Sequence, residues 1–425
     1  MDSLKRISVQ FWLKIALFNL FIVGVLGLLM RLKMVLPIPW INQKFVLHAH
    51  SHFAFAGWVT HALMVLLLLV LHRRSRNLEA KRQNMSLKAQ FLVLANLLIS
   101  YGMLIAFLIQ GYARYSITFS TLSILVSYFF ASHVWSLTKK QSYDPVHTAV
   151  NSWFRAAVLL LVFSSLGTFV LSYLMATHNI DARKQLAAVY FYLHFQYNGW
   201  FLFACFGLFH HWLQHHGIIL KRAKMLFRVF AIAAVPTYFL SVLWWKDMPN
   251  WLYGLVCLLT IAQFIAWFRW FVEIMKRRKE LTSVSTVLVR FLLLVVGLAF
   301  CIKLLLQVLS LLPDLSQLAY GYRPIVIGYL HLVLLAIISL FILAYALTHK
   351  YILENRVSAF GLYLLVVGIL FNELVLMVQG LSGMLRVYID YTHQSLVVAS
   401  AVICIGILVA FSGQFLPIRN RKQLH

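Results

Sequence analysis

Acidic side chains are scarce in this chain of 425 residues. Asp and Glu together number 11, against 37 Lys and Arg, which leaves a formal net charge of +26. Charged residues of either sign make up 11% of the chain and apolar residues 62%, a composition that excludes an ordinary soluble domain and a disordered, highly charged chain. The sequence is therefore predicted to be an integral membrane protein.

Cysteine is also rare, and its spacing excludes several chemistries. Cys205, Cys257, Cys301 and Cys404 lie in apolar runs with no closely spaced pair, so neither a disulfide framework nor a cysteine zinc site is expected. The sequence has no Cys-x-x-Cys-His site for covalent haem attachment and no phosphate-cradling glycine motif. Its basic residues are spread over short loops rather than one long tract, so no nucleic-acid partner is expected.

Apolar runs long enough to cross a bilayer fill most of the chain. A span needs about 20 apolar residues, and twelve runs are predicted to be spans: 10–33, 47–71, 89–111, 116–137, 152–175, 189–209, 226–244, 250–272, 286–311, 325–348, 358–379 and 394–416. Basic residues lie mainly in alternate loops, which places both termini in the cytoplasm. The predicted fold is all-α, one transmembrane domain over residues 1–425 that forms a polytopic bundle of about twelve helices in the lipid of a bacterial-type inner membrane.

Polar side chains gather at one depth of this predicted bundle. With a rise of about 1.5 Å per helical residue, His48 and His52 lie near the outer end of the second span, one turn apart on one face, whereas His50 points away from them. The same outer layer contains polar side chains from other predicted spans: His194, Lys303, Gln307, His331, Glu373 and His393.

An ionisable group inside a span is retained mainly where it faces a bundle interior, a cavity or a partner, because it costs about 2.5–3.5 kcal/mol to insert. One intramembrane His is more often a hydrogen-bond partner between helices than a ligand. Several imidazoles at one level on different helices favour a metal or haem site. A structural polar layer and a metal-free transporter cavity are the alternatives. Glu373 is expected to pair with Lys303; the alternatives are that it delivers protons or contacts water around a haem propionate.

A short motif occurs twice in this layer. "HFAFAGW" runs from His52 to Trp58, and "HFQYNGW" runs from His194 to Trp200. The Gly lies five residues after the His, about 140° around the helix, where the missing side chain lets another helix or a flat macrocycle approach closely. Seven positions are too few to establish an internal duplication.

These residues resemble subunit I of the haem-copper oxidase superfamily. The span layout is similar, and "HSHFAFAGW" is similar to the His-x-His-x4-Gly-Trp pattern of its divergent oxidase-like and nitric-oxide-reductase-like members. The resemblance implies that His52 and His331 clamp a low-spin haem, expected to be of b type, with His48 and His50 beside it. It also implies that His194 matches a copper ligand, which makes copper a second candidate cofactor.

The chain departs from the family pattern at the second metal centre. Tyr329 stands two residues before His331, where the family has the His that holds its reactive haem, and the seventh span has no His for copper. A complete oxygen-reducing centre is therefore not expected, and His194 and His393 are candidates for an unconventional metal site with His48 and His50. Gln196, in the span-six motif, and Gln307 are expected to support the site. Outer-loop arginines are candidates to hold haem propionates: Arg183, Arg323 and Arg386.

The resemblance implies a haem protein of electron transfer or of oxygen or nitric oxide chemistry, and an oxidoreductase if the chain is an enzyme. Its electron donor would be a partner protein or a quinol, and other oxidase-like subunits are candidate partners. A second resemblance is to the NnrS-like nitric-oxide-response family, which contains haem and copper and in which "His-x-His" also opens a span. The His-Glu-Met continuation of that family is absent here.

Overall fold

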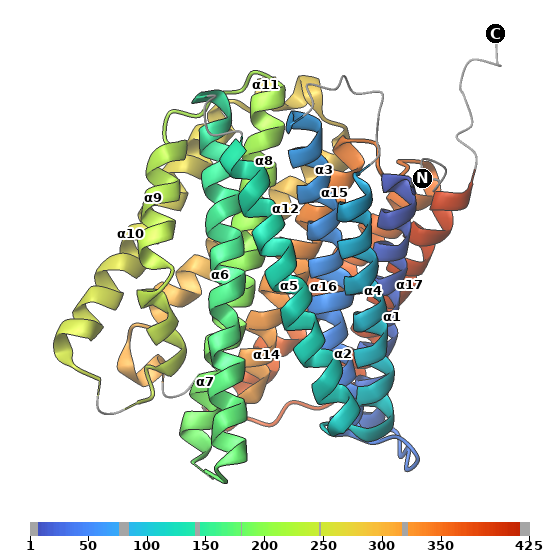
Figure 1. Ribbon diagram of the computed structural model, residues 1–425. Coiled ribbons are helices and arrows are strands. Elements are labelled where there is room, and N and C mark those ends of the chain that lie inside the picture. The colour runs from blue at the N-terminus through green and yellow to red at the C-terminus, as the bar shows by residue number, and fades with distance from the viewer. Residues whose placement is uncertain are drawn as a thin grey trace.

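The computed structural model of the protein describes residues 7–75, 85–140, 145–179, 181–245, 248–316 and 322–416. Within these ranges all regular structure is helical, and the helices run side by side in one bundle (Figure 1). The helix α1 (Val9–Val35) begins, and α17 (Thr392–Ser412) ends, at the same end of the bundle (Figure 1). The prediction of an all-α polytopic helix bundle is confirmed, whereas its orientation in the membrane stays a prediction.

The helices of the first half of the chain follow α1 in this order: α2 (Gln43–Phe53), η1 (Ala54–Thr60), α3 (His61–Ser75), α4 (Leu87–Gln110), α5 (Arg114–Lys140), α6 (Pro145–Ala176), α7 (Ala182–His194), η2 (Phe195–Phe201) and α8 (Leu202–His215). Those of the second half precede α17 and the short η5 (Gly413–Phe415): α9 (Ala223–Ala233), η3 (Pro236–Val242), α10 (Asn250–Lys276), α11 (Arg278–Val284), α12 (Val287–Leu309), α14 (Arg323–His331), η4 (Leu332–Ser339), α15 (Leu340–Thr348) and α16 (Arg356–Leu385).

Ten helices of the described chain are long and apolar enough to cross a bilayer, and each matches one of the twelve predicted runs. The seventh run is α9 with η3, which together make a further candidate span that bends by 53°. The bend lies just before Pro236, whose ring lacks the N–H that an α-helix needs. The sixth run lies within α7, η2 and α8, which are helical throughout. This run is not among the ten, and it carries polar side chains such as His194, Gln196 and Asn198.

Three helical rods form the centre of the bundle, and each changes from α-helix to π-helix just after a His. These central rods are α2–η1–α3, α7–η2–α8 and α14–η4–α15. The π-helix η1 begins two residues after His52, and η2 and η4 begin directly after His194 and His331. Turns of π-helix are rare and occur often at functional sites.

The repeated Gly-Trp motif lies in two of these π-helices and joins the central rods. The indole Nε1 of Trp58 in η1 donates a hydrogen bond to the hydroxyl of Ser339 in η4, at 2.8 Å. The indole Nε1 of Trp200 in η2 donates to the hydroxyl of Thr60 in η1, at 3.4 Å. The two copies of the motif therefore make related contacts, each with a hydroxyl of a neighbouring rod.

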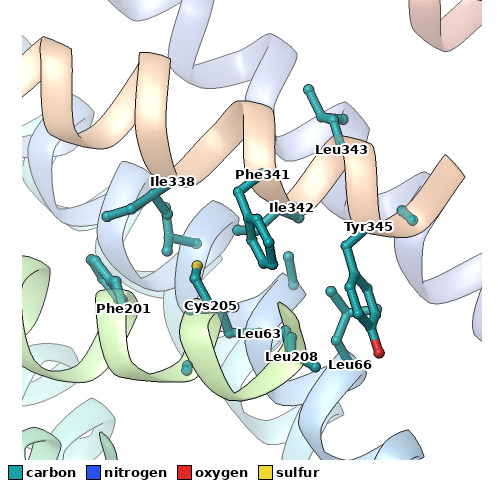
Figure 2. Packing of buried hydrophobic residues seen from close by; sticks show 14 of the residues in the cluster. Leu63, Leu66, Phe201, Cys205, Leu208, Ile338, Phe341, Ile342, Leu343 and Tyr345 are labelled. Atoms are coloured by element: carbon teal, nitrogen blue, oxygen red, sulfur yellow. The ribbon is translucent and has the colours of Figure 1, made fainter. Parts of the chain in front are cut away.

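Toward the end of the bundle that carries the termini, the central rods pack through apolar side chains. Figure 2 shows Leu63 and Leu66 of α3, Cys205 and Leu208 of α8, and Phe341 of α15 gathered in one cluster. Every residue from position 62 to position 71 is at most 2% exposed. A helix that is apolar all round belongs in the interior of a bundle, so α3 is a central element that neighbouring helices shield from lipid.

Candidate functional site

The histidines of α2 face two different neighbours. His48 and His52 lie toward α4: the ring of His52 stacks on Phe107 at a centroid distance of 4.3 Å, and His48 meets the ring of Tyr112 edge-on at 4.5 Å. Nε2 of His52 lies 2.9 Å from the Tyr112 hydroxyl. Burial raises the pKa of Tyr112, so its hydroxyl stays protonated at neutral pH. Nε2 of His52 is therefore engaged with this hydroxyl, which donates to a bare Nε2 or accepts from Nε2–H.

His50 points the other way, toward α1, as the helical period predicts. Its Nδ1 lies 3.1 Å from the carbonyl oxygen of Val23, to which a neutral ring donates its N–H. The ring packs against Gly27, only 3.3 Å from the place that a Cβ there would take. Among the described residues Nε2 of His50 has no hydrogen-bond partner, so its lone pair is available.

His331 is held in the same way at the end of α14. Its Nδ1 lies 2.8 Å from the carbonyl oxygen of Ile327, and its Nε2 has no hydrogen-bond partner in the described part of the chain. His50 and His331 lie close enough for their charges to interact, and Arg31 of α1 lies near both. The structure thus places two imidazoles with free Nε2 atoms near each other, on separate helices.

Neither ring is fully buried: His50 and His331 each keep part of their surface exposed. Their helices pack mainly on other partners: α2 on α1, η1 and α4, and α14 on α16 and η4. No residue of α14 is fully buried. The helices α2 and α14 are therefore not one of the closely packed helix pairs of the described chain.

Charged groups surround this pair. The charges nearest to Arg31 are those of Arg323, at the start of α14, and Glu373 of α16. Oε1 of Glu373 accepts a hydrogen bond from the Asn372 amide at 3.1 Å, and Oε2 lies 3.8 Å from the place of a Cβ on Gly328. Two arginines and one carboxyl group therefore lie around the histidine pair.

The expected ion pair between Glu373 and Lys303 is not formed among the described residues. Glu373 lies beside Arg31 instead. Lys303 of α12 is 2% exposed, its ammonium lies 5.3 Å from the centre of the Phe300 ring, and His194 is its neighbour. The two groups thus have different neighbours in the bundle.

His194 has both ring nitrogens engaged. Its Nε2 donates to the carbonyl oxygen of Ala234 at 2.9 Å, and its Nδ1 accepts from the Asn198 amide at 3.2 Å. Ala234 lies at the break between α9 and η3, where the Tyr238 N–H bonds to the carbonyl of Val235 rather than to that of Ala234. The His194 ring thus satisfies a carbonyl that the bend leaves free.

The other predicted site residues are dispersed. His393 is exposed at the start of α17. Gln196 donates to the hydroxyl of Ser164 at 2.9 Å, and the buried Oε1 of Gln307 has no hydrogen-bond partner among the described residues. The ring of Tyr329 lies edge-on to that of Tyr197 at 6.2 Å. Within the described ranges no three His, Cys, Asp or Glu side chains are placed to hold a metal ion.

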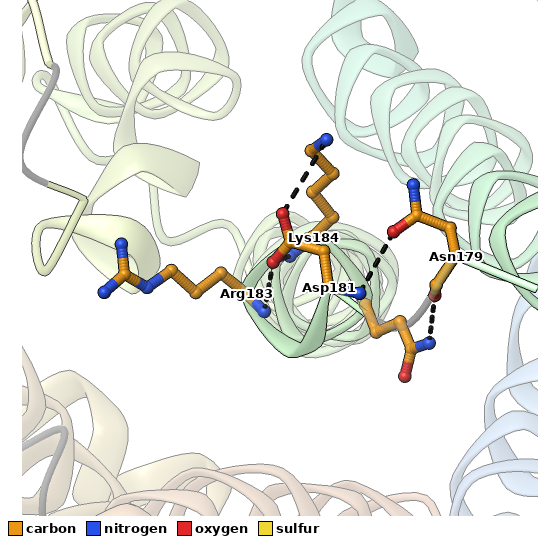
Figure 3. Close-up of polar contacts among 5 residues, drawn as sticks. Asn179, Asp181, Arg183 and Lys184 are labelled. Carbon is orange, nitrogen blue, oxygen red and sulfur yellow. Dashed lines mark hydrogen bonds and ion pairs between the residues drawn. The ribbon is translucent and has the colours of Figure 1, made fainter.

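The three predicted outer-loop arginines do not all lie at the histidine pair. Arg183 lies in the first turn of α7. The carboxylate of Asp181 caps this helix by accepting the backbone N–H of Arg183, and it lies 3.7 Å from the Lys184 ammonium. Figure 3 shows the Arg183 guanidinium directed away from this cap. Arg386 adopts a left-handed conformation, with a φ of 58°, at the end of α16. Of the three predicted arginines, only Arg323 lies beside the charges around His50 and His331.

Sequence reasoning missed Arg31. It lies in "MRLKM" at the end of the first span, opposite to the end that the predicted orientation makes basic. That departure from the positive-inside pattern is the signal that could have identified it.

The chain is similar in fold to an oxidase of known structure. No protein-family model matches the sequence, and no curated protein matches it significantly. A chain of the solved structure described as a heme-copper terminal oxidase dimer superposes with a TM-score of 0.67 and 12% sequence identity. The match covers 96% of this chain and 83% of that chain. At this identity the likeness establishes the helical architecture, which is shared over nearly the whole length of this protein.

Proposed function

We propose that the protein binds a haem between His50 of α2 and His331 of α14 and transfers electrons through it. The observation that carries the proposal is the shared state of the two rings: each donates Nδ1–H to a backbone carbonyl and keeps Nε2 free. Metal-bound histidines are commonly held in this way. The fold shared with a heme-copper terminal oxidase supports the assignment.

The contacts of α2 favour His50 over His52 as the partner of His331. The resemblance in sequence pointed to His52, but its Nε2 is engaged by Tyr112 and its ring is stacked on Phe107. His50 lies on the opposite face and near His331. We therefore assign His48 and His52 to the packing of α2 on α4 and His50 to the haem.

The residues near His50 and His331 also suit the carboxylates of a haem. A haem carries two carboxylates, which the guanidinium groups of Arg31 and Arg323 are able to bind by paired hydrogen bonds. Gly27 lets α1 approach the His50 ring closely. When bound, the haem would supply one-electron transfer. His50 and His331 together would hold it through two imidazoles, which would suit electron transfer better than the binding of oxygen or nitric oxide.

The described residues do not fit copper. His194 would have to give up its bond to Ala234 or to Asn198, and no second or third ligand is placed beside it. We therefore propose no copper site, and we assign His194 to the stabilisation of the bend between α9 and η3. The electron donor that we propose is a partner protein or a membrane quinol, with the chain in a cytoplasmic membrane and both termini inside.

The spectrum of the purified full-length protein in detergent tests this proposal. We expect a Soret band, and a pyridine haemochrome of b type with about one haem or more per chain. A colourless preparation without iron, from cells supplied with haem precursor, would contradict the proposal and favour a metal-free transporter.

A further inference from the structure

A cavity lies between α8, α10, α12 and α15, and neither His50 nor His331 lines it. It encloses about 260 Å³. Its wall is aromatic and aliphatic, with side chains that include Phe206, Phe209, Trp267, Trp270, Phe300 and Phe341. At α11 the lining changes to Arg278, Thr282, Ser285 and Arg290. The cavity is thus apolar within the bundle and cationic at the end of the bundle where α11 lies (Figure 1).

A more open hollow adjoins this cavity at the junction of α10 and α11. It encloses about 430 Å³ and is lined by Val272, Met275, Lys276, Arg278 and Lys279. Met275 and Arg278 line both spaces, so the basic hollow and the apolar cavity share a wall.

The positive charge of the hollow is not neutralised within the described chain. Glu280 pairs with Arg277, at 3.1 Å. Glu273 accepts from the backbone N–H of Lys221 at 2.7 Å and lies 3.6 Å from the Arg222 guanidinium. Among the described residues no carboxylate lies within ion-pair distance of the three cations that line the hollow: Lys276, Arg278 and Lys279.

The side chains of Arg290 and Arg278 differ in their hydrogen bonds. Its Nη1 donates to the carbonyl oxygens of Thr282 and Ser285, at 3.0 and 2.8 Å, and so ties the end of α11 to α12. The Arg278 side chain is exposed and forms no hydrogen bond or ion pair among the described residues. The cation available to a ligand at the shared wall is therefore Arg278.

We propose that the two spaces form one binding site for an anionic phospholipid, with its phosphate in the basic hollow and an acyl chain in the aromatic cavity. The charge is complementary, because the hollow offers three cations and neither space is lined by an acid. By the predicted orientation this end of the bundle faces the cytoplasmic leaflet, whose anionic lipids are attracted to basic segments beside a span. A neutral quinone would leave the hollow unused.

Native mass spectrometry of the full chain in detergent tests the head-group part of the site. Phosphatidylglycerol and phosphatidylcholine with the same acyl chains are titrated, and we expect phosphatidylglycerol to bind at least about tenfold more tightly. The double variant Arg278→Gln and Lys279→Gln should remove most of that preference. The control is Arg277→Gln, because Arg277 is paired with Glu280 and lines neither space. Equal affinity for the two lipids, or an equal loss in the control, would overturn the proposal.

A second pair of variants tests the acyl-chain part. Leu293 lines the cavity, whereas Leu298 on the same helix is 49% exposed and lines neither space. Leu293→Trp should weaken phosphatidylglycerol binding by about tenfold, since it fills space that the chain needs, and Leu298→Trp should leave it unchanged. A free fatty acid that displaces phosphatidylglycerol, or a quinone that co-purifies in its place, would show that the phospholipid assignment is wrong.

Discussion

Removal of the hydrogen bond between the Trp58 indole and the Ser339 hydroxyl tests whether these contacts hold the central rods together. Both residues are at most 3% exposed, and the bond is 2.8 Å long. In membrane proteins such bonds contribute about 0.6 kcal/mol on average and about 1.7 kcal/mol at most. The short, buried geometry places Trp58–Ser339 in the upper part of that range, at about 1–1.7 kcal/mol. The 3.4 Å bond between Trp200 and Thr60 should contribute about 0.6 kcal/mol or less.

Double-mutant cycles measure both couplings. Trp58→Phe, Ser339→Ala and the double variant are unfolded with sodium dodecyl sulfate in mixed micelles, and the same is done with Trp200→Phe and Thr60→Ala. The single Ser339→Ala change also removes the bond from its hydroxyl to the Leu334 carbonyl, at 2.7 Å, and the cycle subtracts that loss. A coupling near zero for Trp58–Ser339, or one smaller than that for Trp200–Thr60, would refute the reasoning.

Three further changes probe Arg31, His194 and His349. Arg31→Gln should lower the haem midpoint potential in a redox titration, because a nearby cation favours the reduced, less positive iron. A shift of the opposite sign would contradict the placement of Arg31 beside the haem. His194→Gln should leave the iron and copper content unchanged in elemental analysis while it lowers thermal stability, whereas a loss of metal would restore His194 as a ligand. Burial lowers the pKa of His349 to about 4, below the value of about 6.5 in the unfolded chain. Protonation therefore favours the unfolded state, and the free energy of unfolding should fall as the pH drops from about 6.5 toward 4, less steeply in His349→Gln.

Length and apolarity were enough to predict the helices, because a bilayer requires runs of about 20 apolar residues. The helical period also separated the face of His48 and His52 from that of His50. Which of these faces looks toward α14 could not be predicted from α2 alone. That choice depends on how α2 is rotated against α1 and α4, which is set by packing contacts such as Gly27 on His50.

The partners of the buried charges could not be predicted. The expected pairing of Glu373 with Lys303 rested on a similar predicted depth, but depth says nothing about the position around the bundle axis, and Glu373 lies near Arg31. The role of His194 depends on the bend before Pro236, since the bend frees the Ala234 carbonyl that the imidazole binds. The three π-helices could not be predicted either, because the same residues fit an α-helical period.

The absorbance of three single variants tests the central claim most directly: His50→Ala, His331→Ala and His52→Ala, purified side by side with the unchanged protein. We expect the low-spin Soret band to disappear, or to change to that of a five-coordinate haem, in His50→Ala and His331→Ala and to persist in His52→Ala. A band that persists in His50→Ala and disappears in His52→Ala would contradict the pairing of His50 with His331.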